Sequence, residues 1–588
     1  MRKLFYAIAL IGVMTFSGCA LNQMVKMAED QTLTVDPNPL EVHADTVKFE
    51  MAANLPAKML KKGKAYSMNT FYKYGDNEIA LEPIQFTSED YPNADSQQPK
   101  QTKEFAFAYS PEMKIGDLEV QGVASDPNGK SKESERLAVA KGIITTSQLV
   151  EPVYFAAYAD HGYNNQEELV PTRVNFYFDQ GRSVLKYSER RSDRGNKLTA
   201  YIADKNLTRT VSITGTHSPE GAERINSRLA KDRAEAIEEF YQREMRKYDY
   251  KGLADSIKFI TKDVVEDWTV FKDSLATYNG ISSEEKSAYL DIINGPGSYE
   301  DKEDKLHQLP TYRKVFRELY PKLRVAKTEI LTVKEKKSDA EISVLAKQIA
   351  NGSASGDSLS EEELLYAATL TPSLEEKEAI LKAATKKTDS WTAHNNLAAV
   401  YIAMAIAGDQ NKVTDALTQL EIASNKEEAA EIQINMATIE MMRGNAYKAY
   451  SHLQNASELE PSNEIEQGLN GVKGSAEIMI AKYNDAIKST SNAEDNAVNL
   501  FNKGLAQLLN KDFRNALTSF KEAAEKDSEM ALAHYGAAVA SARLNNEEDV
   551  YSNLEEAVSN DPELKGKALE DLEFAAYFAN DKFRDVLK

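Results

Sequence analysis

Hydrophobic and polar positions follow three successive patterns along the chain. From about residue 32 to 160 they alternate, as in Val47-Lys48-Phe49-Glu50-Met51, which predicts strands with one buried face. Alternating runs and runs with helical spacing then follow each other, and beyond about residue 360 only helical spacing remains. The fold class predicted is multidomain, with a β-sandwich-like region at 37–165, an α/β sandwich domain at 166–335 and an all-α solenoid at 361–588.

The amino terminus has the pattern of an export signal. Arg2 and Lys3 precede an apolar run of thirteen residues, 4–16, whereas a membrane-spanning helix needs about 20. The run closes on Phe16-Ser17-Gly18-Cys19, which resembles a bacterial lipobox. The resemblance implies a signal peptide at 1–18, diacylglycerol on the thiol of Cys19, a further acyl chain such as palmitate, and an anchor linker at 19–36. An ordinary secretory signal with a cysteine near its end is the alternative.

The residue after the cysteine bears on localisation. By resemblance to lipoprotein sorting, Ala20 in place of an aspartate favours the outer membrane. We therefore expect a lipid-anchored outer-membrane protein whose body faces the periplasm.

Charge and cysteine content exclude some classes of ligand and site. The sequence carries 92 acidic against 71 basic residues, and its formal charge of −21 argues against binding nucleic acid through a basic surface. The single cysteine excludes an intrachain disulfide framework and any CxxC metal or redox site.

A motif stands in the middle region. A strand-like run ends at Gly215-Thr216-His217-Ser218-Pro219-Glu220-Gly221, and a helical run then carries Asn226, Leu229, Arg233 and Ala234. This spacing resembles the OmpA-like peptidoglycan-associating domain, and residues 268–323 resemble the helical insertion of Bacteroidota-type members. The whole chain resembles a Bacteroidota-type envelope lipoprotein in which an OmpA-like domain precedes tetratricopeptide repeats.

The resemblance implies a peptidoglycan-binding site. In that family an aspartate and an arginine grip the zwitterionic diaminopimelate of the peptide stem. Arg233 stands at the arginine position, Asn226 is in register, and Ser218 replaces the aspartate. Two interpretations remain open: retained binding to peptidoglycan, or a degenerate domain that acts as a structural spacer.

A repeat follows the predicted linker at 336–360. The interval from Ala437 to Gly504 is 67 residues and that from Gly504 to Ala538 is 34, which is the tetratricopeptide (TPR) period. The second helices keep the same offsets in three units, at Ala449, Leu453 and Ala456, at Ala516, Phe520 and Ala523, and at Val550, Leu554 and Ala557.

A solenoid of this kind has a concave face that binds peptides or proteins. Asn396, Asn435 and Asn502 share one first-helix position, and in TPR proteins an asparagine there often hydrogen-bonds the main chain of a bound peptide. Met441 and Tyr535 are the predicted apolar contacts of this groove. The alternative is that the asparagines cap or bridge neighbouring helices.

No catalytic or metal-ligating constellation is found, and no cofactor is expected. The seven histidines are scattered, and HExxH, GxxxxGK[ST], GxGxxG and GxSxG are absent from the sequence. The leading hypothesis is a non-enzymatic protein-binding scaffold or adaptor. The alternatives are a tether that links the outer membrane to peptidoglycan, within a secretion or envelope assembly machine, and an unrecognised hydrolase in the β-rich region.

Overall fold

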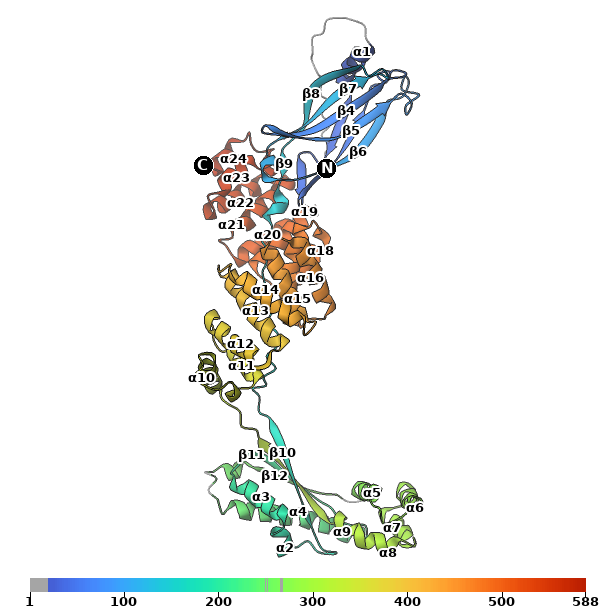
Figure 1. The fold of residues 1–588 in the computed structure, drawn as a ribbon, viewed down its shortest axis with the longest axis vertical. Coiled ribbons are helices and arrows are strands. Elements are labelled where there is room, and N and C mark those ends of the chain that lie inside the picture. The colour runs from blue at the N-terminus through green and yellow to red at the C-terminus, as the bar shows by residue number, and fades with distance from the viewer. Residues whose placement is uncertain (1–19, 249, 251, 265–267) are drawn as a thin grey trace. The chain divides into compact units, whose positions relative to one another are not determined.

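The chain divides into two compact units (Figure 1). The structure, a computed structural model, describes residues 20–248, 250, 252–264 and 268–588. Unit 1 comprises the chain up to Tyr163 together with Asp339–Lys588, and unit 2 comprises Asn164–Ser338. The predicted signal peptide and Cys19 lie outside the described residues.

Two sheets form the β-rich part of unit 1. One has the order β1-β3-β2-β9 with β6 also paired to β3, and the other has the order β5-β4-β7-β8. Both contribute to one core, and the predicted alternation is confirmed, because Val47, Phe49 and Met51 of β3 are buried. The strands are β1 (Thr32–Asp36), β2 (Leu40–His43), β3 (Thr46–Asn54), β4 (Ala65–Tyr74), β5 (Asn77–Thr87), β6 (Lys100–Ala108), β7 (Asp117–Ser125), β8 (Ser131–Lys141) and β9 (Ile143–Ile144).

The segment expected to be an anchor linker is folded from Ala20 onward. Helix α1 (Ala20–Met27) contacts β7 and β8 and buries Leu21, Met24 and Val25 in the core that both sheets share, and β1 pairs with β3. The apolar spacing of α1 explains this, since three residues on one helical face can cover a sheet. Short 3-10 turns are η1 (Ala28–Asp30), η2 (Pro111–Met113) and η3 (Thr146–Leu149).

Paired helices form the rest of unit 1. They are α10 (Asp339–Ala350), α11 (Glu361–Thr369), α12 (Leu374–Thr388), α13 (Trp391–Ile406), α14 (Lys412–Ser424), α15 (Ala430–Met442), α16 (Ala446–Glu458), α17 (Asn463–Met479), α18 (Tyr483–Ser491), α19 (Ala497–Leu509), α20 (Phe513–Lys526), α21 (Ala531–Arg543), α22 (Glu547–Asn560), α23 (Leu564–Glu570) and α24 (Asp581–Val586), with η5 (Gly356–Ser358) and η6 (Leu572–Phe574).

The repeat chemistry explains how the helices pack. A Cβ at Gly504 or Gly536 would lie 2.8 or 2.6 Å from the ring of Phe520, so the small residues make room for the aromatic side chain between repeats.

The predicted linker 336–360 differs from expectation, because α10 lies within it and buries Ile342 and Ala346 against α11 and α12.

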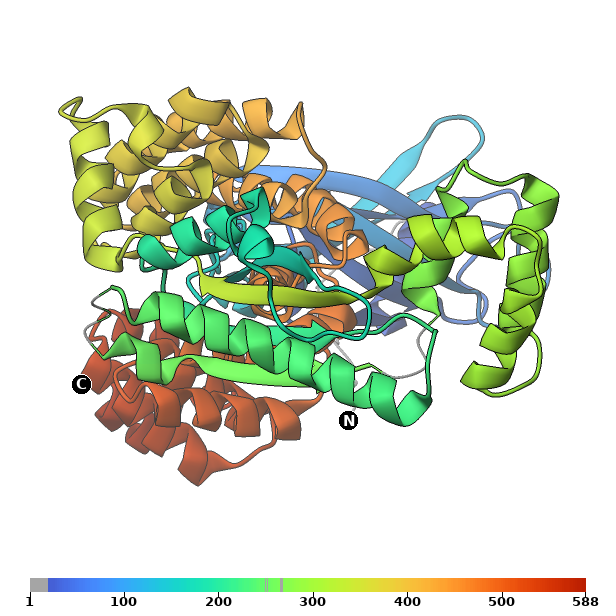
Figure 2. The same cartoon turned by 90° about the horizontal axis from the view of Figure 1, so that it is seen from below.

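Unit 2 has one four-stranded sheet in the order β10-β13-β11-β12, with only β11 and β12 parallel. Helices α3 and α4 contact the sheet and each other, and Figure 2 shows the long α4 lying along it. The elements are β10 (Leu169–Tyr177), α2 (Tyr187–Arg190), α3 (Asp193–Ala203), β11 (Thr208–Gly215), α4 (Glu223–Met245), η4 (Leu253–Ser256), β12 (Lys258–Asp263) and β13 (Val325–Val333).

Five further helices occupy the expected insertion 268–323 and have a core of their own, with Phe271, Tyr289 and Tyr320 at its centre. They are α5 (Thr269–Ala276), α6 (Ser283–Asn294), α7 (Tyr299–His307), α8 (Tyr312–Glu318) and α9 (Tyr320–Leu323). Within the described ranges, no helix is long and apolar enough to cross a membrane.

Gly215 controls how closely α4 packs on the sheet. A Cβ there would lie 1.9 Å from the carbonyl oxygen of Ala230, which is main chain and cannot rotate away. We therefore expect Gly215→Ala to destabilise unit 2 by about 2 kcal/mol or more. Urea unfolding followed by Trp268 fluorescence in a Trp391→Phe background measures this. A wild-type midpoint would contradict the close packing of α4 on β11.

Candidate functional site

The inner helices of the repeat array are buried on nearly all sides. In α13 and α15 most residues are buried whatever their polarity, including Asn395, Asn396, Asn435 and Thr438. A helix that is buried on all sides must have other parts of the protein packed against both its inner and its outer face. The second helices of the repeats cover one face, and the structure shows that the chain itself covers the other.

The covering segment is residues 150–163, which we call the strap. It joins the β-rich region to unit 2 and contains no helix or strand. It runs opposite to the order of the repeats, since Glu151 bonds to α19, Ala157 to α15 and Ala159 to α13. The concave face predicted to receive a partner is therefore filled by the protein's own main chain.

Three asparagines grip the strap through both main-chain groups of one residue. Asn396 accepts from the N–H of Ala159 at 2.7 Å and donates to its carbonyl at 2.9 Å. Asn435 does the same to Ala157 at 2.8 and 2.8 Å, and Asn502 to Glu151 at 3.0 and 2.7 Å. A side-chain amide has one acceptor and one donor side, which matches the main chain of an extended residue.

Other side chains complete the series between these three. Ser475 Oγ accepts from the N–H of Val153 at 3.2 Å, and Thr438 Oγ1 donates to the carbonyl of Phe155 at 2.9 Å. Asn395 Nδ2 donates to the carbonyl of Ala157 at 3.1 Å. The array thus bonds every second residue of the strap from 151 to 159, which is the periodicity of an extended chain.

Small residues set the distance between strap and helices. Ala157 and Ala159 are 0% and 5% exposed. On α17, a Cβ at Gly468 would lie 2.5 Å from the ring of Phe155, and one at Gly471 would lie 3.2 Å from Val153 Cγ1. These glycines admit the larger side chains of the strap, so the fit depends on small residues on both sides.

The two remaining predicted groove residues lie inside the array. Met441 is buried in a cluster that also contains Ala157. Tyr535 is 0% exposed, donates to Asp571 Oδ2 at 2.7 Å and packs edge-on against Phe574. Tyr535 therefore supports the C-terminal repeats from within.

The strap ends at aromatic residues of α11. Tyr163 stacks on Tyr366 with ring centroids 4.7 Å apart, and His161 lies edge-on to the same ring at 5.1 Å. The hydroxyl of Tyr366 also donates to Asp339 Oδ1 at 3.1 Å. Tyr366 thus holds both the residue at which the chain leaves unit 1 and the residue at which it returns.

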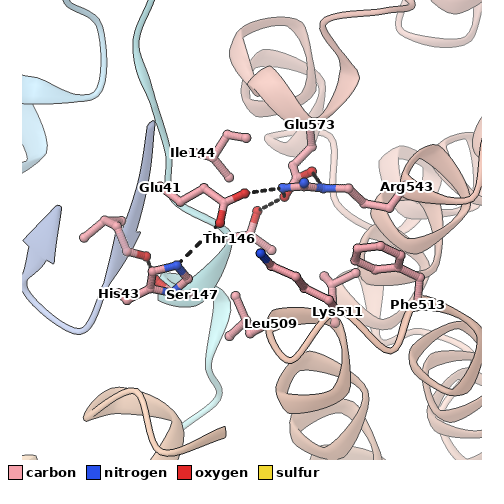
Figure 3. Close-up of a pocket in the computed structure, with 12 residues that line it drawn as sticks. Glu41, His43, Ile144, Thr146, Ser147, Leu509, Lys511, Phe513, Arg543 and Glu573 are labelled. Atoms are coloured by element: carbon pink, nitrogen blue, oxygen red, sulfur yellow. Dashed lines mark hydrogen bonds and ion pairs between the residues drawn. The ribbon is translucent and has the colours of Figure 1, made fainter. Parts of the chain in front are cut away.

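An ionic cluster fixes the other end of the strap, in the pocket of Figure 3. Arg543 bonds Glu41 of β2 at 2.9 Å and Glu573 of η6 at 2.5 Å, and Thr146 donates to Glu573 at 2.7 Å. His43 contacts the second oxygen of Glu41 at 3.4 Å. Because both carboxylates already bind Arg543, the pocket acts as a joint between the β-rich region and the last repeats.

Electrostatics support that role. Burial alone raises the pKa of Glu41, but hydrogen bonds from His43 and Arg543 and the charge of Arg543 outweigh it and lower the pKa to about 2. Burial likewise lowers the pKa of Arg543, but its two carboxylate partners outweigh it and raise the pKa above its ordinary value. Glu41 and Arg543 therefore stay charged at neutral pH, whereas burial raises the pKa of the Glu573 carboxyl above its ordinary value.

The predicted peptidoglycan-binding residues of unit 2 are engaged within the domain. Arg233 is 1% exposed and donates to the carbonyls of Arg182, Thr216 and Asp179 at 3.0, 2.8 and 3.3 Å. Burial and the neighbouring Arg324 guanidinium lower the pKa of Arg233 to about 10. Arg233 thus ties the middle of α4 to the loops beside it.

Ser218 and Asn226 also have internal partners. Arg324 donates to Ser218 Oγ at 2.9 Å and to Glu220 Oε1 at 2.6 Å. Asn226 donates to the carbonyls of Glu220 and Gly221, which fixes the turn before α4. The sequence motif gives no sign of this role of Arg324, because Ser218 and Glu220 lie 106 and 104 residues before it in the chain.

The strap itself was missed as a functional segment. Residues 150–163 fall within 37–165, the range predicted to be β-sandwich-like, and the structure gives them no strand. Ser475, Thr438 and Asn395 lie on the same inner faces as the predicted asparagines, and small polar residues on otherwise apolar helices were the available signal. Among the described residues, no group of three or more His, Cys, Asp or Glu side chains could hold a metal ion.

No family model and no curated protein matches the sequence. Solved structures similar to this chain are TPR proteins. YrrB, described as a TPR protein with an unusual peptide-binding site, is 19% identical over 32% of this chain and 98% of its own, with a TM-score of 0.28. Part of a TPR protein from Cytophaga hutchinsonii is 17% identical over 39% and 92%, with a TM-score of 0.29.

The pilF protein of Pseudomonas aeruginosa is 16% identical over 41% of this chain and 99% of its own, with a TM-score of 0.30. TM-scores this low carry no argument about function. The C-terminal region is helical and consistent with TPRs, and that statement rests on its own paired helices and 34-residue spacing.

Gly468→Ala tests the docking of the strap. Alanine normally stabilises a helix relative to glycine by about 0.5–1 kcal/mol, but here the new methyl group would collide with Phe155. We expect faster chymotrypsin cleavage after Tyr154, Phe155 and Tyr158. The matched control is Gly566→Ala in α23, where nothing lies within 4 Å, and which should cleave as the wild type does. Equal resistance of both variants would contradict the close packing.

Glu41→Gln tests the ionic joint. A pKa lowered from 4.5 to about 2 in the folded state stabilises it above about pH 4.5, and this contribution disappears as the pH falls toward 2. We expect the variant to lose up to about 3 kcal/mol of protection of the β2 amides at pH 7, measured by native-state hydrogen exchange, and nothing near pH 2.

The matched control for this joint is Glu82→Gln, whose side chain is 88% exposed and pairs with Lys103 at 3.0 Å. It should leave protection unchanged at both pH values. A pH-independent effect of Glu41→Gln would show that the charge of this carboxylate does not hold the joint.

Proposed function

We propose that this chain is an outer-membrane lipoprotein that acts as a protein-binding scaffold and performs no catalysis of its own. The observation that supports it most directly is the inner face of the array, which binds polypeptide main chain through the side chains of Asn396, Asn435 and Asn502. A surface built to hold main chain suits recruitment of polypeptides.

The anchor completes the proposal. Acyl chains on Cys19 would hold the mature protein to the outer membrane with its body in the periplasm. Lipid attached to both the thiol and the amino group anchors stably, whereas one acyl chain binds reversibly. The first described helix, α1, starts at Ala20, the residue after Cys19, so the β-rich region would stand close to the lipid surface.

Unit 2 serves in this proposal as an OmpA-like domain that has become a spacer. The alternative, a tether to peptidoglycan, needs Arg233 to reach a ligand, but its donors face three main-chain carbonyls and the side chain is 1% exposed. Ser218 and Glu220 are likewise bonded to Arg324. The internal bonding of these groups favours the spacer over the tether.

Metabolic labelling with an alkynyl palmitate tests the anchor. Because Cys19 is the only cysteine, Cys19→Ser removes the lipidation site without touching another thiol. We expect the wild type to carry the label and sediment with outer membranes, and the variant to lose both properties. An unlabelled wild type, or a variant that still sediments with the membranes, would contradict anchoring.

Chemical crosslinking of the same cells tests the scaffold. Purification of the tagged wild type should recover defined partner proteins that are absent from cells without the chain. If only the chain itself is recovered, the scaffold function is wrong, whatever the labelling shows.

A further inference from the structure

The groove recognises the strap through main chain rather than through side-chain identity. Nine hydrogen bonds join the inner helices to residues 151–159, and each ends on a main-chain N–H or C=O of the strap. Such bonds are available in any polypeptide that adopts the same extended conformation. Specificity must therefore come from the size of the side chains that the groove admits.

We propose that the groove is a binding site for an extended segment of a partner protein with small residues at two alternate positions, and that the strap is a built-in ligand which competes for it. This inference rests on the proposed scaffold function and names the ligand class of its site. The structure shows the groove in its closed state, with the strap bound.

The small-residue requirement follows from burial. Ala157 and Ala159 are almost fully enclosed, and the amides of Asn395 and Asn435 close on the carbonyl of Ala157. A larger or charged side chain at either position would separate the main chain from these amides. Two residues earlier, at Phe155, an aromatic side chain fits because Gly468 leaves space beneath it. The expected partner motif is therefore an aromatic residue followed by two small residues at alternate positions.

The outer edge of the strap is open. Tyr154 and Tyr158 are each 37% exposed. Among the described residues, no hydrogen bond engages the main-chain groups of Tyr154, Ala156 or Tyr158, so the hydrogen bonds that hold residues 151–159 all come from the inner helices. A competing segment can replace the strap without removal of any further layer of the protein.

Covalent attachment makes the strap a strong competitor. It is tethered at the Arg543 cluster and at Tyr366, and a short tether gives an effective concentration on the order of 1 mM. If the intrinsic dissociation constant of the strap for the groove is about 10 µM, a competing segment would bind the intact protein about 100-fold more weakly than a strap-free protein. The partner must either bind tightly or act when the strap has been released.

The test uses a full-length variant whose residues 150–163 are replaced by a Gly/Ser sequence of equal length. The probe is a fluorescein-labelled peptide of residues 149–163, and binding is measured by fluorescence anisotropy. We expect saturable binding to this variant and binding at least about 100-fold weaker to the wild type. An Ala157→Glu peptide, or Asn435→Ala in the protein, should reduce binding at least about tenfold.

A second variant serves if the first does not fold. Full-length Ala157→Glu/Ala159→Glu keeps every other residue but expels the strap, and it should bind the wild-type peptide. Tyr154→Glu, at an exposed strap position, is the matched control and should bind as weakly as the wild type. Circular dichroism establishes that each protein is folded.

The outcomes are distinct. Absence of binding to a folded strap-free or strap-expelled protein overturns the inference, as does equal binding to the wild type. Concentration-dependent dimers of the wild type that the strap-free variant does not form would make the occupant a second copy of this chain, and would also overturn it. Peptide binding without crosslinked partners in cells would instead defeat the scaffold function and leave the peptide site standing.

Discussion

The pairing of side-chain amides with main-chain groups is the interaction on which unit 1 depends. A main chain that crosses a buried surface must find partners for its N–H and C=O groups, since each unsatisfied group costs about 1–3 kcal/mol. In a sheet a neighbouring strand supplies these hydrogen-bond partners. Here the side-chain amides of Asn396, Asn435 and Asn502 supply them, and each binds a different strap residue. Without these amides the strap could not lie on the array, and the inner helices would expose their apolar faces.

Local patterns explain how much of this could be predicted. The alternation in β3 and the 34-residue period of the helices each depend on near neighbours, and both are readable in the sequence. The asparagine positions were also readable, because Asn396, Asn435 and Asn502 share one first-helix position of the repeat. Their occupant was not, since Ala159 and Glu151 lie 237 and 351 residues from the asparagines that bind them. A role of these asparagines toward a partner protein stays a prediction.

The same distinction applies in unit 2. The motif from Gly215 to Ala234 predicted a strand, a turn and a helix, and β11 and α4 stand there. It did not reveal where the guanidinium of Arg233 points, because its acceptors come from loops 17 to 54 residues away. Nor did the motif reveal the role of Arg324, whose guanidinium donates hydrogen bonds to the hydroxyl of Ser218 and to the carboxylate of Glu220. A motif fixes residue spacing along one element, whereas a binding site depends on what other elements bring to it.

Both ends of the strap are held by contacts that would change if the strap left the groove. Unit 2 is inserted between Tyr163 and Asp339, and both residues contact Tyr366, by ring stacking at 4.7 Å and by a hydrogen bond of 3.1 Å. At the other end, the Arg543 cluster joins the strap's entry to β2 and η6. On the return side, α10 packs on α11 and α12 and does not depend on the strap. Under the proposed competition, a ligand that displaces the strap must also break the stacking of Tyr163 on Tyr366, so occupancy of the groove and the order of residues 150–163 change together.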